Sequence, residues 1–220
     1  MVIKKVWEIA FLLSWLYSNL MISFDIVDEC KARLQAERID FVSVDIDNVA
    51  LLQAMIFCMC ELDQACRVAY IHDRKNEHLK SVMLEIDALH TDIMKKIIAR
   101  YGWLIISRFG KETDQQAFLL VQHARDVDFQ AACLDLLEQA LDNEETHPRH
   151  YAYLYDRVAL QQEKYNYQQK YGTQFYLTEQ GDFILLPYQG SLEDVDRRRL
   201  SIGLSSLAEY SNRFISLYQK

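Results

Sequence analysis

The chain has few residues that interrupt regular structure, with only two prolines and six glycines among 220 residues. A β-sandwich of many strands needs a turn about every ten residues, and turns are rich in these two residue types. Their scarcity therefore favours long helices. Half of the residues are hydrophobic, which is enough for a full core and argues against disorder.

The signatures of several common enzyme classes are also absent. The sequence contains no glycine-rich phosphate loop, no nucleophile elbow and no alternation of strands and helices. The formal charge of −8 argues against a nucleic-acid partner, because neutralising phosphates requires a basic face. The one basic cluster, Arg197-Arg198-Arg199, lies among Glu193, Asp194 and Asp196. We expect these residues to form a helix face of salt bridges.

The five cysteines follow neither the spacing of a disulfide framework nor that of a zinc site. Cys58 and Cys60 lie in an apolar segment, and residues two apart on a helix diverge by roughly 200°. They cannot share a metal ion, so we expect core thiols in a reducing compartment. His147 and His150 have suggestive i, i+3 spacing but no other ligands nearby. The sequence predicts no metal site and no cofactor.

Residues 1–44 are predicted to form a separate helical extension. Lys4-Lys5 precede an apolar segment from Val6 to Tyr17, which superficially resembles a signal peptide. Glu8 interrupts that segment, no small-x-small cleavage site follows, and the segment is short for a membrane span. We expect helices over about residues 3–20 and 23–37 that pack on the domain. Signal function and membrane contact through the first helix are the alternatives.

Residues 45–220 are predicted to form one mainly α domain, a compact bundle with a single β-hairpin near residues 175–187. Gly102 is expected to end a helix, and 103–110 to be a loop. Thr113-x-x-Gln116 has the pattern of a capping box that opens another helix. Gly203 is expected to separate two short C-terminal helices. The other expected helices cover residues 45–71, 79–100, 128–141 and 146–164.

Several short motifs follow one another in this part of the chain, and their joint order is more specific than any one of them. In this order they resemble a bacterial family of unknown function, from about Leu62 to Phe214. The resemblance implies a protein of the bacterial cytoplasm, with secretion as an effector as the alternative, and it assigns no activity. The motifs are Asp63-Gln64-Ala65-Cys66-Arg67, Gln122-His123-Ala124 (QHA), residues 152–158 (AYLYDRV), Tyr171-Gly172-Thr173-Gln174 (YGTQ), Val195-Asp196 with Arg198-Arg199, and Gly203-Leu204 to Tyr210.

Two positions depart from the pattern of that family. The family usually continues QHA with an acidic residue, where this chain has Arg125 followed by Asp126. It also tends to have an acidic pair after the hairpin proline, where this chain has Gln189-Gly190. If either acid takes part in a site, this copy is altered or inactive.

His123 is the sharpest candidate for chemistry, because an imidazole can act as a general acid or base at physiological pH. The alternative is a core histidine that bonds a helix terminus or Asp156. Asp63 and Arg67 are four residues apart and can pair along a helix. If both are buried, a polar network or a ligand is the natural explanation.

Polar candidates on four separate segments indicate a site, because a purely structural signature would be mostly apolar. Tyr171 and Gln174 would offer a hydroxyl and a carboxamide to a ligand, although a tight turn at Gly172 also explains that loop. We predict an inter-helix polar pocket that binds or acts on a small polar ligand, and leave open whether the protein is an enzyme. The alternatives are a protein-interaction module without catalysis, of effector or immunity type, and a purely structural helical domain. The candidates are His123 and Asp156 for catalysis, and Gln64, Arg67, Gln122, Arg157, Tyr171 and Gln174 for ligand binding.

Overall fold

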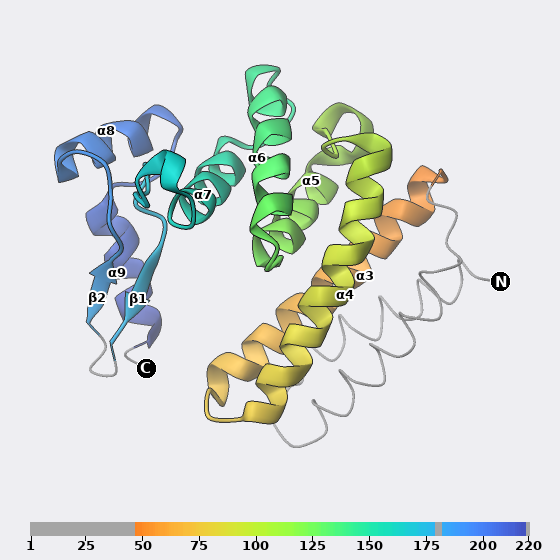
Figure 1. Ribbon diagram of the computed structural model, residues 1–220, viewed down its shortest axis with the longest axis horizontal. Helices are drawn as coiled ribbons and strands as arrows, with labels where there is room; N and C mark the ends of the chain where they lie inside the picture. Colours follow the sequence, from red (N-terminus) through yellow and green to blue (C-terminus); the bar gives the residue numbers. More distant parts are fainter. Residues whose placement is uncertain (1–46, 179–181, 219–220) are drawn as a thin grey trace. The chain divides into compact units, whose positions relative to one another are not determined.

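The computed structural model describes residues 47–178 and 182–218. The two helices expected over residues 3–20 and 23–37 lie outside the described residues, so the N-terminal extension stays a prediction. The described chain falls into two compact units, the first ending at Asp126 and the second beginning at Val127. It contains seven α-helices and one two-stranded antiparallel hairpin, which confirms the mainly α expectation (Figure 1).

The first unit contains three helices: α3 (Val49–His72), α4 (Glu77–Tyr101) and α5 (Ile106–His123). Each of the three contacts the other two. The side chains of Asn48 and Asn76 cap α3 and α4 by accepting from backbone N–H groups in the first turn. Gly102 ends α4 as predicted, with a φ of 68° that favours glycine. Figure 1 shows α3 and α4 running side by side.

The α3–α4 interface is apolar, which explains why the two long helices pair. Leu62 and Cys66 on α3 pack with Val82 and Ile86 on α4, and all four are buried. Of the described helices, α3 alone is long and apolar enough to cross a membrane by length and composition, and half of that apolar segment is buried.

The prediction of a loop over residues 103–110 was wrong for the second half of that segment. Helix α5 begins at Ile106, and Gly110, with a φ of 83°, interrupts its helical geometry. Thr113 lies inside the helix and is buried, so it does not cap the helix as predicted. The neighbouring Asp114 instead accepts a hydrogen bond of 2.8 Å from Nε1 of Trp103, which fixes the start of α5 to the segment before it.

The second unit begins with two helices that pack on each other, α6 (Val127–Asp142) and α7 (Pro148–Ala159). Pro148 occupies the first turn of α7 as expected, and the His147 ring caps it by accepting from the backbone N–H of Arg149. The helix ends at Ala159, five residues before the predicted end. A short 3-10 helix (η1, Glu163–Tyr165) follows.

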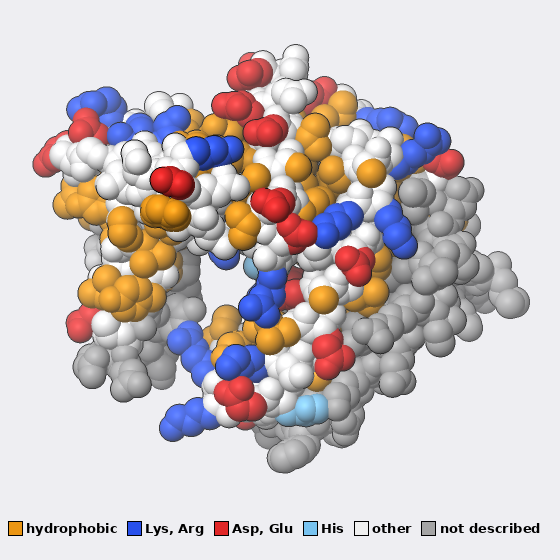
Figure 2. Space-filling view, in the orientation of Figure 1, with side chains coloured by type: hydrophobic (Ala, Val, Ile, Leu, Met, Phe, Trp, Pro, Cys, Tyr) orange, Lys and Arg blue, Asp and Glu red, His pale blue; other side chains and the backbone are white. Residues whose placement is uncertain are grey.

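The predicted hairpin is present as β1 (Phe175–Leu177) and β2 (Phe183–Leu185). On one face Phe175 and Phe183 stack with ring centroids 4.3 Å apart. On the other face the cross-strand pair Tyr176 and Ile184 is exposed, and Figure 2 shows hydrophobic side chains gathered over the hairpin.

Two helices end the described chain, α8 (Leu192–Ser201) and α9 (Leu207–Tyr218), and Gly203 lies between them as predicted. A capping box between Ser191 and Asp194 starts α8. The predicted salt-bridged face of α8 holds only for Arg197, which pairs with Asp194 at 2.9 Å. Arg199 is 1% exposed and points into the unit.

Candidate functional site

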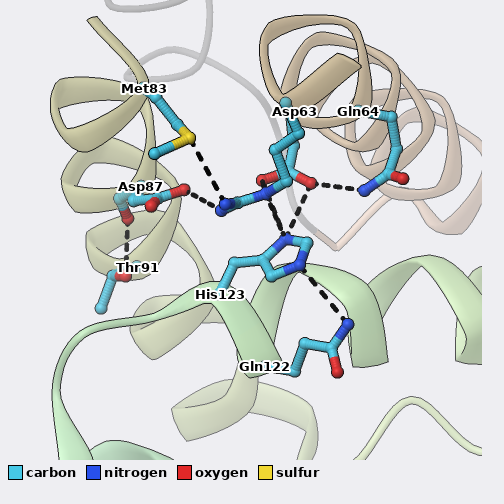
Figure 3. A network of polar contacts seen from close by, with 8 residues as sticks. Asp63, Gln64, Met83, Asp87, Thr91, Gln122 and His123 are labelled. Atoms are coloured by element: carbon cyan, nitrogen blue, oxygen red, sulfur yellow. Dashed lines mark hydrogen bonds and ion pairs between the residues drawn. The ribbon is translucent and has the colours of Figure 1, made fainter. Parts of the chain in front are cut away.

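The first unit holds a cluster of polar side chains where its three helices meet. His123 is the last residue of α5, and its Nδ1 lies 2.9 Å from Oδ2 of Asp63 on α3. Figure 3 shows the cluster, with Asp63 and Gln64 approaching from α3, Met83 and Asp87 from α4, and Gln122 and His123 from the end of α5. Three helices therefore supply the site.

Arg67 of α3 links these groups, because its side chain contacts residues of α3, α4 and α5. Its Nε lies 3.1 Å from Oδ1 of Asp63 and 2.9 Å from Nδ1 of His123. Its Nη2 donates to Oδ1 of Asp87, and its Nη1 reaches only the sulfur of Met83, at 3.6 Å. The pair expected between Asp63 and Arg67 is thus present, but it belongs to a larger network.

Two glutamines lie at the edges of the cluster. Gln64 donates from its amide to Oδ2 of Asp63 at 2.7 Å, and the Gln122 amide nitrogen lies 3.4 Å from Nε2 of His123. Asp63 is 2% exposed, whereas His123 is 16% and Arg67 22% exposed. The acid is therefore buried behind a histidine and an arginine that solvent can reach.

The two carboxylates of the cluster respond differently to burial. Burial raises the pKa of Asp63, but the hydrogen bond and charge of His123 and the charge of Arg67 outweigh it, and the pKa falls below its ordinary value. For Asp87, burial prevails over the charge of Arg67, and the negative charge of Asp63 adds to it, so the pKa is raised. Asp87 is therefore the carboxylate of the cluster that protonates more readily.

This geometry selects one form of the neutral His123 ring. A proton on Nδ1 can be donated to either oxygen of Asp63, at 3.0 and 2.9 Å. A lone pair on Nδ1 could accept from Nε of Arg67, 2.9 Å away, but it would also face the negative carboxylate, whereas that Nε–H has Oδ1 of Asp63 as another acceptor at 3.1 Å. We therefore assign the proton to Nδ1, which leaves the lone pair of Nε2 facing the amide of Gln122. A buried carboxylate that orients a histidine in this way is the arrangement found in catalytic triads.

No serine, threonine or cysteine forms a hydrogen bond with His123 in the described part of the chain. Burial, reinforced by the charges of Asp63 and Glu61, raises the pKa of the Cys60 thiol to about 12, and burial does the same for Cys133. These thiols are not activated nucleophiles. The four described cysteines are buried, as expected of core thiols. Among the residues that the structure describes, none supplies His123 with a nucleophile.

The second candidate catalytic residue, Asp156, lies in the second unit and binds backbone. It is fully buried on α7, and its carboxylate accepts from the backbone N–H groups of Lys170, Tyr171 and Thr173 at 2.6, 2.9 and 2.9 Å. Burial raises the pKa of Asp156 and these three bonds oppose the rise. Asp156 therefore holds the YGTQ loop in place.

Two arginines of α8 bond carbonyl groups of the same loop. Nε of Arg198 donates to the carbonyl of Lys170 at 2.7 Å. Arg199 donates to the carbonyls of Ser205 and Tyr171 at 2.7 and 2.8 Å. The expectation of salt bridges here was wrong because both side chains bond main-chain oxygens.

The remaining candidates of the second unit have mainly structural surroundings. The Tyr171 ring is buried and makes edge contacts with Tyr151 and Tyr155. Gln174 is half-buried, and its amide donates to the hydroxyl of its neighbour Thr173. Gly172 has a φ of 65° and supplies the tight turn that the sequence predicted. Arg157 is half-buried on α7.

The departures from the family pattern also have visible surroundings. Arg125 is exposed, and the adjacent Asp126 pairs with Lys95 of α4 at 2.7 Å. The amide of Gln189 donates to the carbonyl of Gln168, and a side chain at Gly190 would collide with Asp194. Neither position contributes an acid to the His123 cluster.

The structure thus distributes the predicted site residues over two units. Gln64, Arg67, Gln122 and His123 meet in the first unit, and Asp156, Arg157, Tyr171 and Gln174 belong to the second. One pocket shared by all eight stays a prediction. Within residues 47–178 and 182–218, no group of three or more His, Cys, Asp or Glu residues is arranged to hold a metal ion.

Sequence reasoning missed Asp87, Met83 and the loop contacts of Arg198 and Arg199. A signal for Asp87 did exist, since it is an acid four residues after Met83, beside the apolar stripe of α4. Nothing in the local sequence distinguished Arg199 from its exposed neighbour Arg197.

Comparisons with known proteins give one match. A model described as "Family of unknown function (DUF6624)" matches residues 50–219. No curated protein and no solved structure is significantly similar to the chain.

Proposed function

Because the chain belongs to this family of unknown function, we propose its role from its own geometry: the cluster of Asp63, Arg67, Asp87 and His123 binds a small polar molecule, and His123 acts on it as a general base. The observation that carries the proposal is the pairing of a buried acid with an accessible histidine on another helix. Burying a carboxylate in a helix interface carries a desolvation cost, which Arg67, His123 and Gln64 offset here. The carboxylate in turn orients a ring that is 16% exposed.

Each side chain has a definite part in this proposal. Asp63 keeps the proton on Nδ1 of His123, so the lone pair of Nε2 can accept a proton from water or from a ligand hydroxyl that displaces the Gln122 amide, 3.4 Å away. Asp63 also stabilises the imidazolium that forms, as the acid does in a catalytic triad. Gln64 and Gln122 offer amide groups at the edges of the cluster. The proton accepted by Nε2 returns to the product or to solvent.

The proposal predicts the tautomer of His123, which ¹⁵N chemical shifts of the imidazole nitrogens report directly. In the wild type at alkaline pH, Nδ1 should carry the proton and Nε2 the lone pair. Asp63→Asn should shift the proton toward Nε2, because the amide can donate to Nδ1. Asp47→Asn is the matched control, since Asp47 contacts Arg100 and Tyr101 instead. A wild-type ring protonated on Nε2 would show that His123 is not the proposed base.

The alternative of a protein-interaction module stays a prediction. The exposed pair Tyr176 and Ile184 on the hairpin is compatible with it. Singly exposed hydrophobic residues are common on proteins, so this pair is weaker support than the His123 cluster.

A further inference from the structure

The guanidinium of Arg67 is only partly satisfied by its neighbours. It has five N–H groups, of which the one on Nε donates to Asp63 and one on Nη2 donates to Asp87. Among the described residues, the two N–H groups of Nη1 reach only the Met83 thioether, a weak acceptor. The side chain is 22% exposed, so a ligand can approach it. The two N–H groups of Nη1 are strong donors that lack an oxygen acceptor among the described residues. A half-buried guanidinium in this state favours an oxygen-bearing anion.

We propose that the site binds an oxyanion, the carboxylate or phosphate group of a small molecule, on Nη1 of Arg67 beside His123, and that binding takes up a proton. This inference rests on the proposed function, since it names the class of molecule that the same cluster binds. The anion would anchor the molecule, and His123 would face the group that loses a proton.

Proton uptake follows from the charges that face the site. Asp63 and Arg67 on α3, Asp87 on α4 and a neutral His123 on α5 sum to one net negative charge, from two carboxylates and one guanidinium. His90, buried three residues after Asp87, is a further titratable group on α4. An added anion would be repelled unless the cluster gained a proton.

Asp87 is the group suited to accept that proton. Its pKa is raised, and protonation would weaken its hold on Nη2 of Arg67. His123 stays neutral and keeps the lone pair that a general base needs. The Cys60 thiol, which lies within the field of Asp63, is already neutral because its pKa is about 12. Binding should therefore tighten as the pH falls.

Titration of the full chain with acetate, and separately with inorganic phosphate, tests this inference by NMR. The signals to follow are the Nε–H of Arg67 and the ring of His123, at about pH 6 and about pH 8. Acetate keeps a single charge over this range, so its pH dependence isolates proton uptake by the protein. We expect saturable shifts that require less acetate at the lower pH. Saturation by only one of the two probes would identify which oxyanion the site prefers.

Variants separate the site from general anion attraction. Asp87→Asn removes the competing negative charge, so it should bind acetate about three- to tenfold more tightly at the higher pH and show a weaker pH dependence. Arg67→Lys loses the two donors of Nη1 and should bind weakly. Arg100→Gln, which alters an exposed arginine of the same helix as Asp87, should bind like the wild type. If Arg67→Lys does not fold, the acetate affinity of Asp87→Asn alone decides whether the anion binds at this site.

The outcomes separate this inference from the proposed function. Shifts that never saturate in the wild type or in Asp87→Asn, or that are equal in Arg67→Lys, overturn the anion site. If the anion site is overturned but the proton of His123 is found on Nδ1, the general-base proposal still stands. Saturable binding with the proton found on Nε2 would leave the anion site standing and remove the general base.

Discussion

Asp156→Ala is expected to lower the free energy of unfolding of the second unit by about 3–5 kcal/mol. Three backbone N–H groups, the half-buried one of Lys170 and the buried ones of Tyr171 and Thr173, would lose their acceptor together. Each such group costs about 1–3 kcal/mol when left unsatisfied. Removing the buried negative charge of Asp156 recovers part of this cost. The expected loss of stability is therefore smaller than three times the largest cost of one unsatisfied group. Urea unfolding followed by amide NMR signals of residues 127–218 measures it.

Two further variants sharpen this test. Asp156→Asn keeps one acceptor oxygen and should lose less than Asp156→Ala. His123→Ala should cost only about 1 kcal/mol, because Asp63 keeps Arg67 and Gln64 as partners. If His123→Ala is the more damaging change, then His123 holds its unit together and Asp156 is free for another role.

Arg199→Met is expected to cost about 2–4 kcal/mol in the same unit. The methionine fills much of the volume but leaves the carbonyls of Ser205 and Tyr171 without their donor. It also removes the guanidinium from the Tyr210 ring, whose centroid lies 4.6 Å from Cζ. Burial lowers the pKa of Arg199, and no carboxylate of the described residues bonds it, so losing the charge recovers part of this cost.

Arg197→Met is the matched control for this prediction. Arg197 is two residues earlier on α8, 76% exposed, and pairs with Asp194. Its loss should change stability by no more than about 0.5 kcal/mol. Equal effects of the two substitutions, read from the same urea curves, would contradict the role assigned to Arg199.

Much of the fold could be predicted because it depends on local signals. The apolar spacing of α3 and α4, the stop at Gly102 and the hairpin were all read correctly from residues close together in sequence. The start of α5 was misjudged because Thr113-x-x-Gln116 imitates a cap, whereas the side chain of Thr113 is buried in the unit. Tertiary packing overrode the local preference there.

The candidate site was only half predictable for a related reason. Arg67 and His123 were identified, but the partner that completes their network, Asp87, lies on another helix and is marked in the sequence only by its position beside an apolar stripe. Asp156 was predicted as a catalytic acid, whereas its surroundings are backbone N–H groups. A carboxylate in a short motif looks the same in sequence whether it faces a ligand or a loop.

The contact between Asp63 and His123 also has a consequence for chain entropy. It closes a loop of 60 residues, whereas the bond from Asp156 to Lys170 closes one of 14. By the logarithmic dependence on loop length, the longer closure costs about 1.3 kcal/mol more. The hydrogen bonds between Asp63 and His123 stabilise the contact by little more than this entropic cost. The packing of α3 against α4 and α5 must therefore supply the remaining free energy that holds the loop closed. Any change that loosens those helices therefore disperses the His123 cluster, even where it touches none of its residues.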